Sequence, residues 1–213
     1  IMNAASFGEF ALENEALQFG EFTLKSGRIS PYFFNAGKFN QGAAFNALGR
    51  SYASTLIQAG ISFDLLFGPA YKGIPLATAA SIALDSQYQR SVGVTFNRKE
   101  AKTHGEAGKL IGAPLAGRIV IVDDVITAGT AIRESMDLIQ EAGAEPAAVL
   151  VALDRQEKGP EGKSAIQEIE KAYNIPVLAI AKLQDLLEFA KTHDDLSSQL
   201  EQLTSYRQTY GID

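Results

Sequence analysis

The sequence of 213 residues contains no cysteine and only two histidines, His104 and His193. Without cysteine, the chain cannot form disulfides, thiolate zinc sites, iron–sulfur clusters or a cysteine nucleophile. The two histidines lie far apart in sequence, which excludes a multi-histidine metal centre and leaves a Ser–His–Asp triad only one of these two to recruit. Because no feature indicates an oxidising compartment, we expect a cytoplasmic protein.

A basic net charge and long apolar segments are also missing. The chain has 19 Lys and Arg against 25 Asp and Glu, a formal net charge of −6. Since such a surface repels phosphate backbones on average, we expect no nucleic-acid partner, and an anionic ligand must be bound by a local basic cluster. The longest apolar run, residues 147–153, is too short to cross a membrane, so we expect no membrane association.

Strand-like and helical patterns alternate along the chain. Short apolar segments typical of buried strands lie at residues 63–68, 93–97, 118–124, 147–153 and 176–180. Helical patterns lie at residues 3–18, 42–59, 73–87, 130–141, 162–173 and 183–210, the last with a break near Asp194 and Asp195. Two β-like stretches around Ser26, Gly27 and Arg28 predict a hairpin. Apolar strands alternating with helices predict a parallel sheet covered on both faces, in one α/β domain over residues 1–213 with a small N-terminal extension.

Residues 119–131, IVIVDDVITAGTA, carry the strongest functional signal. Four β-branched residues predict a buried strand, two carboxylates follow it, and residues 127–130 lead into a helix. In an open parallel sheet, ligands bind where strands end and helices begin. Small and hydroxyl residues at a helix N-terminus offer free backbone N–H groups and the positive end of the helix dipole, so this loop predicts a phosphate site.

Asp123 and Asp124 would repel a phosphate placed directly on them. They fit a neighbour that donates hydrogen bonds or carries positive charge, such as sugar hydroxyls, a divalent metal or an oxocarbenium-like centre. The pair therefore indicates a ribose phosphate more than a bare phosphate, and its carboxylates should face the ligand, not the protein interior. The structural alternative is that the two aspartates merely end a strand and cap a turn.

Residues 120–131, VIVDDVITAGTA, closely resemble the phosphoribosyl pyrophosphate signature of the type I phosphoribosyltransferases. The segments FTLKSGRISPYFFNAG, FGPAYKG, FNRKEAKTHGE and LDRQE resemble those of the bacterial orotate phosphoribosyltransferases in this family. The resemblance extends in order over nearly the whole chain. It implies an α/β fold with a central, mainly parallel sheet flanked by helices, and a small hood made from about residues 1–40 and C-terminal elements.

The resemblance also implies an activity. The 5-phosphoribosyl group would pass from phosphoribosyl pyrophosphate to N1 of orotate, which yields orotidine 5′-monophosphate and pyrophosphate in de novo pyrimidine (UMP) biosynthesis. The family uses Mg²⁺ bound mainly to phosphoribosyl pyrophosphate, with Asp123 and Asp124 as candidate protein ligands. It also forms homodimers in which each catalytic loop closes over the partner subunit's site.

Residues 98–109, RKEAKTHGEAGK, hold four basic and two acidic residues, so this segment is positive in an acidic chain. Its two glycines predict a flexible loop, and a solvated surface loop is the alternative. A cation about 4 Å from a leaving pyrophosphate is worth about 1 kcal/mol in water and about 4 kcal/mol at an effective dielectric near 20. By resemblance, Arg98, Lys99, Lys102 and His104 belong to the catalytic loop that stabilises this charge.

The resemblance assigns further residues to phosphoribosyl pyrophosphate. Tyr71 and Lys72 belong to its pyrophosphate loop, with a strained, cis peptide implied near Ala70–Tyr71, and Lys25 reaches the same substrate. The residues whose backbone would hold the 5-phosphate are Val125, Ile126, Thr127, Ala128, Gly129, Thr130 and Ala131. The residues assigned to catalysis are Arg98, Lys102, His104, Asp123 and Asp124.

By resemblance, orotate would be bound by Lys25, Phe33, Phe34, Thr127 and Arg155. A flat, anionic pyrimidine suits a receptor with aromatic rings and a cation, and we expect Phe33 and Phe34 to flank the base. An arginine fork pairs with a carboxylate bidentately, so Arg155 would separate orotate from uracil. Taken alone, aromatic residues at a strand end are usually core residues, and a single lysine is usually solvated.

Three other functions fit less of the sequence. A phosphoribosyltransferase for a purine or for uracil would have no use for Arg155. A regulator that senses a ribosyl compound and binds nucleic acid could dispense with the basic loop and would want a basic surface. A Rossmann dehydrogenase would need a G-x-G-x-x-G motif after a strand, which is missing. His193 receives no function.

Overall fold

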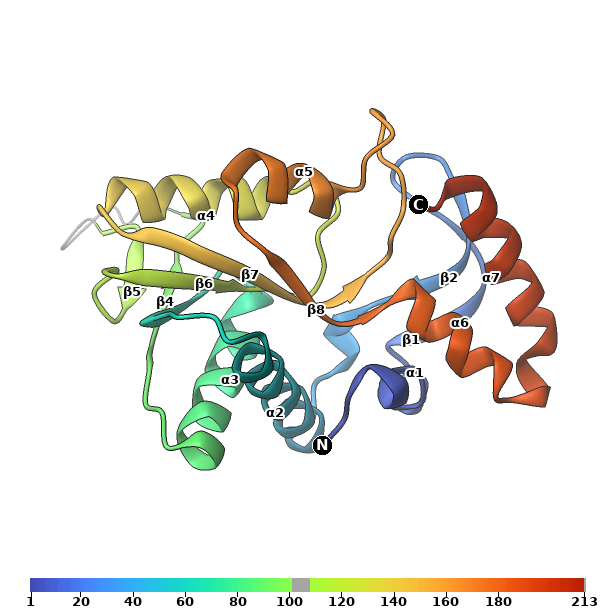
Figure 1. Cartoon of the computed structure of the whole chain (residues 1–213), viewed down its shortest axis with the longest axis horizontal. Helices are drawn as coiled ribbons and strands as arrows, with labels where there is room; N and C mark the ends of the chain where they lie inside the picture. Colours follow the sequence, from blue (N-terminus) through green and yellow to red (C-terminus); the bar gives the residue numbers. More distant parts are fainter. Residues whose placement is uncertain (101–107, 213) are drawn as a thin grey trace.

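The structure, a computed structural model, describes residues 1–100 and 108–212 (Figure 1). In chain order, its elements are α1 (Ala4–Glu13), β1 (Leu17–Thr23), β2 (Ile29–Phe34), the 3₁₀ helix η1 (Ala36–Lys38), α2 (Gly42–Ala59), β3 (Leu65–Gly68), α3 (Gly73–Tyr88), β4 (Gly93–Asn97), β5 (Leu110–Gly112), β6 (Arg118–Val122), α4 (Thr130–Glu141), β7 (Glu145–Asp154), α5 (Ala165–Tyr173), β8 (Val177–Lys182), α6 (Leu183–Lys191), the 3₁₀ helix η2 (Asp194–Leu196) and α7 (Ser197–Tyr210).

The larger sheet has six strands in the order β5-β4-β3-β6-β7-β8, and neighbouring strands are parallel except for β4 and β5. This arrangement confirms the predicted, mainly parallel α/β fold. From β3 the chain runs outward to β4 and β5, and it then returns to β6 on the other side of β3. The strand order therefore reverses between β3 and β6, and the carboxyl ends of two such strands outline a crevice in which ligands bind.

Apolar side chains project from both faces of this sheet. Ile119 and Ile121 of β6 belong to the core beneath α4 and α5, whereas Val120 and Val122 belong to the core that includes α2 and α3. Figure 1 shows these two pairs of helices on opposite faces of the sheet. Because successive side chains of a strand point to opposite faces, both sets of positions must be apolar. This explains why the strands have no polar face.

The β1–β2 hairpin, α1, α6 and α7 form a second group of elements at one end of the sheet (Figure 1). The ring centroid of Phe7 in α1 lies 5.8 Å from that of Phe34 in β2. Tyr206 of α7 meets Tyr32 of β2 edge-on, with centroids 6.5 Å apart. The N-terminal and C-terminal segments of the chain thus pack on each other.

Most predicted boundaries agree with the structure, and the helices predicted at residues 42–59 and 130–141 coincide with α2 and α4. The first helix is shorter than predicted and ends at Glu13, because the chain from Leu17 onward pairs in the hairpin. The polar stretch 98–112 contains an unpredicted strand, β5, which depends on antiparallel pairing with β4. In the described part of the chain, no helix is long and apolar enough to span a bilayer.

Candidate active site

The crevice between the carboxyl ends of β3 and β6 brings together two of the predicted motifs. The loop that follows β3 carries Lys72, and Asp124 lies two residues beyond the end of β6. Lys72 Nζ lies 3.4 Å from Asp124 Oδ2. The side chain of Lys72 is 59% exposed and that of Asp124 11% exposed, so the pair extends from the protein interior toward solvent. A cation and a carboxylate therefore meet where the fold predicts a ligand.

Glycine allows the loop after β3 to pack directly on the end of β6. A Cβ atom at Gly73 would lie 2.8 Å from the carbonyl oxygen of Val122, closer than side chains tolerate. The Ala70–Tyr71 peptide bond is cis, as the family resemblance implies. The backbone N–H of Ala70 donates to Asn97 Oδ1 at 2.7 Å, which ties the loop to the end of β4. Three neighbouring strands thus fix the position of this loop.

The two aspartates are more buried than the sequence led us to expect, with 8% of Asp123 and 7% of Asp124 exposed. The N–H of Asp124 donates to Asp123 Oδ1, and the N–H of Val125 donates to Asp124 Oδ1, so each carboxylate also shapes the turn. Burial, together with repulsion from Asp124, raises the pKa of Asp123 to about 7. Asp124, through Oδ2, is the member of the pair that reaches the exposed cation.

The N-terminus of α4 follows directly and is open to solvent. Gly129, its N-cap, has a φ of 79°, and no capping hydrogen bond from a side chain is found among the described residues. The neighbouring residues Thr127, Ala128, Thr130 and Ala131 are exposed. The first N–H groups of a helix have no partner within the helix, and they lie at the positive end of its dipole. This arrangement can bind a phosphate.

A hollow of about 330 Å³ lies beside the loop after β3. It is lined by Tyr71, Ile74, Phe96, Asn97, Arg98, Lys99, Glu100 and Ile111. Lys99 Nζ lies 5.3 Å from the centre of the Tyr71 ring. The structure therefore brings the first two predicted basic residues next to the loop that carries Lys72. Most of the predicted catalytic loop, with Lys102 and His104, lies outside the described residues.

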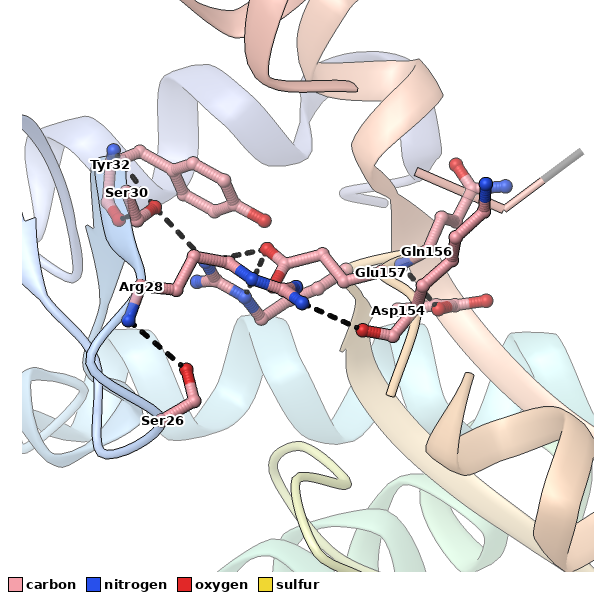
Figure 2. Close-up of polar contacts among 9 residues, drawn as sticks. Ser26, Arg28, Ser30, Tyr32, Asp154, Gln156 and Glu157 are labelled. Atoms are coloured by element: carbon pink, nitrogen blue, oxygen red, sulfur yellow. Dashed lines mark hydrogen bonds and ion pairs between the residues drawn. The ribbon is translucent and has the colours of Figure 1, made fainter. Parts of the chain in front are cut away.

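Arg155, which follows β7, is directed toward β2 of the hairpin. Its Nη2 donates to Ser30 Oγ at 3.1 Å, and its guanidinium lies 4.0 Å from the centre of the Tyr32 ring. Its Nε also donates to Glu157 Oε1 at 2.9 Å. Figure 2 shows this cluster between the hairpin and the segment after β7. Arg155 thus lies against the strand that carries Phe33 and Phe34.

The two phenylalanines of β2 do not present their rings to the same space. Phe33 is 40% exposed and its ring stacks on Phe22, whereas Phe34 is buried against Phe7 and Phe39. Adjacent residues of a strand point to opposite faces, so the expectation that both rings flank one base is corrected. The other two residues assigned to the base, Lys25 in the hairpin turn and Thr127 before α4, are exposed.

Three side chains that hold this site together had no role in the sequence analysis. The hydroxyl of Tyr52 in α2 donates to the backbone carbonyl of Asp123 at 2.8 Å. Asn97 binds the loop after β3, and Glu157 binds Arg155. The contact of Asn97 could have been suspected, because it is a polar residue at the end of an apolar strand. The pairing of Arg155 with Glu157 could have been suspected from their spacing of two residues. Nothing in the sequence around Tyr52 distinguishes it from a core residue.

Comparisons with known proteins agree with this geometry. Residues 35–177 match the phosphoribosyl transferase domain family. The chain is 58% identical over 208 residues to an orotate phosphoribosyltransferase of Thioalkalivibrio sulfidiphilus, covering 98% of both chains, and 59% identical to one of Stutzerimonas stutzeri, covering 97% of both. The crystal structure of the Francisella tularensis orotate phosphoribosyltransferase is similar with a TM-score of 0.87 at 44% identity, over 96% of this chain and 98% of that one. The fold is that of the type I phosphoribosyltransferases, and the chain belongs to the orotate phosphoribosyltransferases of this family.

Proposed function

We propose that the protein transfers the 5-phosphoribosyl group from phosphoribosyl pyrophosphate to N1 of orotate, releasing pyrophosphate and forming orotidine 5′-monophosphate for UMP synthesis. The observation that carries this proposal is the contact between Lys72 and Asp124 beside the uncapped N-terminus of α4. One crevice thus holds a cation for a pyrophosphate, carboxylates for ribose hydroxyls and free N–H groups for a 5-phosphate. Membership of the orotate phosphoribosyltransferases supports the choice of base.

Each part of the crevice has a role in this reaction. The backbone of residues 125–131 binds the 5-phosphate, and Asp123 and Asp124 bind the ribose hydroxyls. As the bond from C1 to the pyrophosphate oxygen breaks, negative charge develops on the leaving group, which Tyr71 and Lys72 contact. The basic residues that stabilise the same charge are Arg98, Lys99, Lys102 and His104. Preorganised cations of this kind act mainly by stabilising the transition state.

Orotate lies between the crevice and the hairpin in this proposal. Arg155 binds its carboxylate, since a guanidinium matches a carboxylate in geometry as well as in charge. The exposed ring of Phe33 contacts the flat pyrimidine, while Lys25 and Thr127 complete the base site. Phe34 contributes through its backbone, because its ring is buried in the core.

The residues at the crevice fit a magnesium ion that the substrate supplies with most of its ligands. Within the described residues there is no group of three or more carboxylates and histidines placed to hold a metal. Mg²⁺ is commonly bound by one or two carboxylates together with substrate phosphates, and Asp123 and Asp124 provide oxygen atoms of that kind. When bound, Mg²⁺ would neutralise charge on the pyrophosphate.

We further propose a cytoplasmic homodimer in which Lys102 of each subunit acts in the partner's site. Mixing and reassembling two impaired variants, Lys102→Ala and Asp124→Asn, tests the dimer. Each hybrid dimer would contain one site with both native residues, so activity would return to about a quarter of the wild-type value. If Lys102 acts within its own subunit, the mixture will be no more active than the two variants alone.

A direct assay tests the reaction. The protein is incubated with phosphoribosyl pyrophosphate, Mg²⁺ and either orotate or uracil, and loss of the free base is followed by ultraviolet absorbance. We expect consumption of orotate alone. Consumption of uracil, or of neither base, would contradict the proposal.

A further inference from the structure

Three charged side chains lie together, largely buried, between the hairpin and the segment after β7. Glu157 Oε1 accepts a hydrogen bond from Nε of Arg155 at 2.9 Å, and it forms an ion pair with Nη2 of the same residue at 2.8 Å. Glu157 Oε2 lies 3.6 Å from Nη1 of Arg28. The side chains of Arg28, Glu157 and Arg155 are only 22%, 13% and 16% exposed, so solvent screens these interactions weakly. Figure 2 shows Glu157, in the segment after β7, with its side chain extending toward Arg28 and Ser30 of the hairpin region.

Other contacts hold the two partners of Glu157 in place. Arg28 donates to the carbonyl of Lys158 at 3.1 Å, and its guanidinium lies 4.2 Å from the centre of the Tyr210 ring. Arg155 lies over Tyr32 and donates to Ser30. Glu157 also forms a backbone bridge with Gly211. The hairpin, the end of β7 and the C-terminal segment therefore meet at this one carboxylate.

The charges of the cluster do not cancel. Two guanidinium groups share one carboxylate, which leaves a net positive charge. Burial raises the pKa of Tyr32 and of Tyr206, so both phenols remain neutral at ordinary pH. Asp154, the carboxylate beside Arg155 in the chain, accepts the backbone N–H of Gln156, and the positive charge of Lys182 acts on it. The buried positive charge of the two guanidinium groups favours an anion nearby.

We propose that Glu157 is a positioning residue for orotate. Arg28 shares the negative charge of Glu157, so that Arg155 keeps a positive charge that attracts the substrate carboxylate. Glu157 and Ser30 engage Nε and Nη2 of Arg155, which leaves the N–H groups of Nη1 for the substrate carboxylate. Arg28 forms an ion pair with the second oxygen of Glu157, and this prevents that carboxylate from fully neutralising Arg155. This inference rests on the proposed function and deepens it, because it identifies what sets the selectivity for an anionic base.

Steady-state kinetics with both substrates test the first part. Glu157→Gln keeps the size of the side chain and an oxygen acceptor but removes the charge. We expect KM for orotate to rise about 10-fold, as for loss of a hydrogen bond between charged groups, with KM for phosphoribosyl pyrophosphate and kcat changed less than about 3-fold. Glu161→Gln, at an exposed position in the same segment, is the matched control and should change neither KM.

A double-variant comparison tests the second part. Arg28→Gln leaves Glu157 to neutralise Arg155, so KM for orotate should rise by a similar factor. The double variant Arg28→Gln, Glu157→Gln restores the net positive charge, and it should bind orotate more tightly than Arg28→Gln does. A purely structural role predicts the reverse, because the double variant loses both contacts. Circular dichroism of each variant verifies folding, and Glu157→Asp, which keeps the charge, replaces Glu157→Gln if that variant does not fold.

The outcomes separate this inference from the proposed function. A wild-type protein that does not consume orotate overturns the proposed function itself. If the wild type does consume orotate, but Glu157→Gln raises both KM values equally or leaves KM for orotate unchanged, the role of Glu157 is wrong while the reaction stands. A double variant weaker than Arg28→Gln would refute the shared charge.

Discussion

The crevice between β3 and β6 and the cluster around Arg155 are assembled in different ways. Most of the crevice comes from residues that are close in sequence, since β6, Asp123, Asp124 and the start of α4 all lie within residues 118–131, and Lys72 is added from the loop after β3. The cluster joins Arg28 and Ser30 of the hairpin region to Arg155 and Glu157, more than a hundred residues later. The β6 side of the crevice can be predicted from one motif, whereas the cluster around Arg155 exists only in the folded chain. This difference leads to separable effects of mutation.

The largest expected effect is on the step that the crevice catalyses. Lys102→Ala should lower kcat by about 10²–10³, the usual effect of losing one preorganised charge partner of the transition state. Steady-state turnover measures this loss, and Lys171→Ala at an exposed position of α5 is the control. A nearly normal kcat in the Lys102→Ala variant would show that Lys102 is not a catalytic residue.

Substitutions in the cluster around Arg155 should instead change the affinity for orotate. Arg155→Ala should raise KM for orotate about 10²-fold, because truncating one partner of a buried charge pair costs about 2–5 kcal/mol. KM for phosphoribosyl pyrophosphate should change far less, since we propose that this substrate binds at the crevice. The control, Arg118→Ala, removes an arginine that pairs with Glu145 at the amino end of β6. Equal losses for both substrates would show that Arg155 does not read the base.

A smaller effect is expected where the crevice depends on backbone geometry. Gly129 has a φ of 79°, and a Cβ atom there would lie 2.7 Å from Arg133 Nη1. Gly129→Ala should therefore destabilise the protein by about 1 kcal/mol and, by moving the start of α4, raise KM for phosphoribosyl pyrophosphate about 10-fold. Gly143, with a φ of 73° and open space around its Cβ position, is the matched control beyond the other end of α4. Gly143→Ala should lose similar stability without a change in KM.

The last expected effect concerns the stability of the free protein and not a kinetic constant. The pKa of Asp123 is raised to about 7 by burial and by Asp124, so between the ordinary pKa near 3.8 and pH 7 the folded state binds more protons than the unfolded state. Stability from this group is fully present below pH 3.8 and is lost as pH rises to about 7. Asp123→Asn removes this loss, so its melting temperature should exceed that of the wild type by roughly 10 °C at pH 8.

The pH profile of that difference is the sharper observation for Asp123. The gap in melting temperature should widen from pH 4 to pH 7 and level off above it. A gap that is constant across this range would mean that Asp123 is ionised in the folded protein throughout. Near-normal KM for phosphoribosyl pyrophosphate in the same variant would place the ribose contact on Asp124 alone.

The sequence predicted the elements of the crevice because their signals are local. The β-branched run at residues 119–122 and the small residues before α4 specify strand, turn and helix start within a few residues of one another. The direction of the Phe34 ring could not be predicted in this way. Either face of β2 could have been the core face, and α1 packs against the one that carries Phe34.

Contacts between residues far apart in the sequence likewise could not be predicted from it. Tyr52 binds the carbonyl of Asp123 only because α2 lies against that face of the sheet. The pairing of Glu157 with Arg28 needs the hairpin, the end of β7 and the C-terminal segment in one place. Hydrophobic periodicity cannot predict such a contact, because the residues that form it belong to different elements, each with its own pattern.

The sequence alone determined the alternation of strands and helices, the parallel sheet and the loop that leads from β6 into α4, because hydrophobic periodicity and helix-start chemistry act over short stretches of chain. Only the tertiary structure decided which charges share a buried environment, how deeply Asp123 and Asp124 lie, and which ring of β2 reaches the surface. These properties depend on burial and on distances between remote residues, and packing sets both.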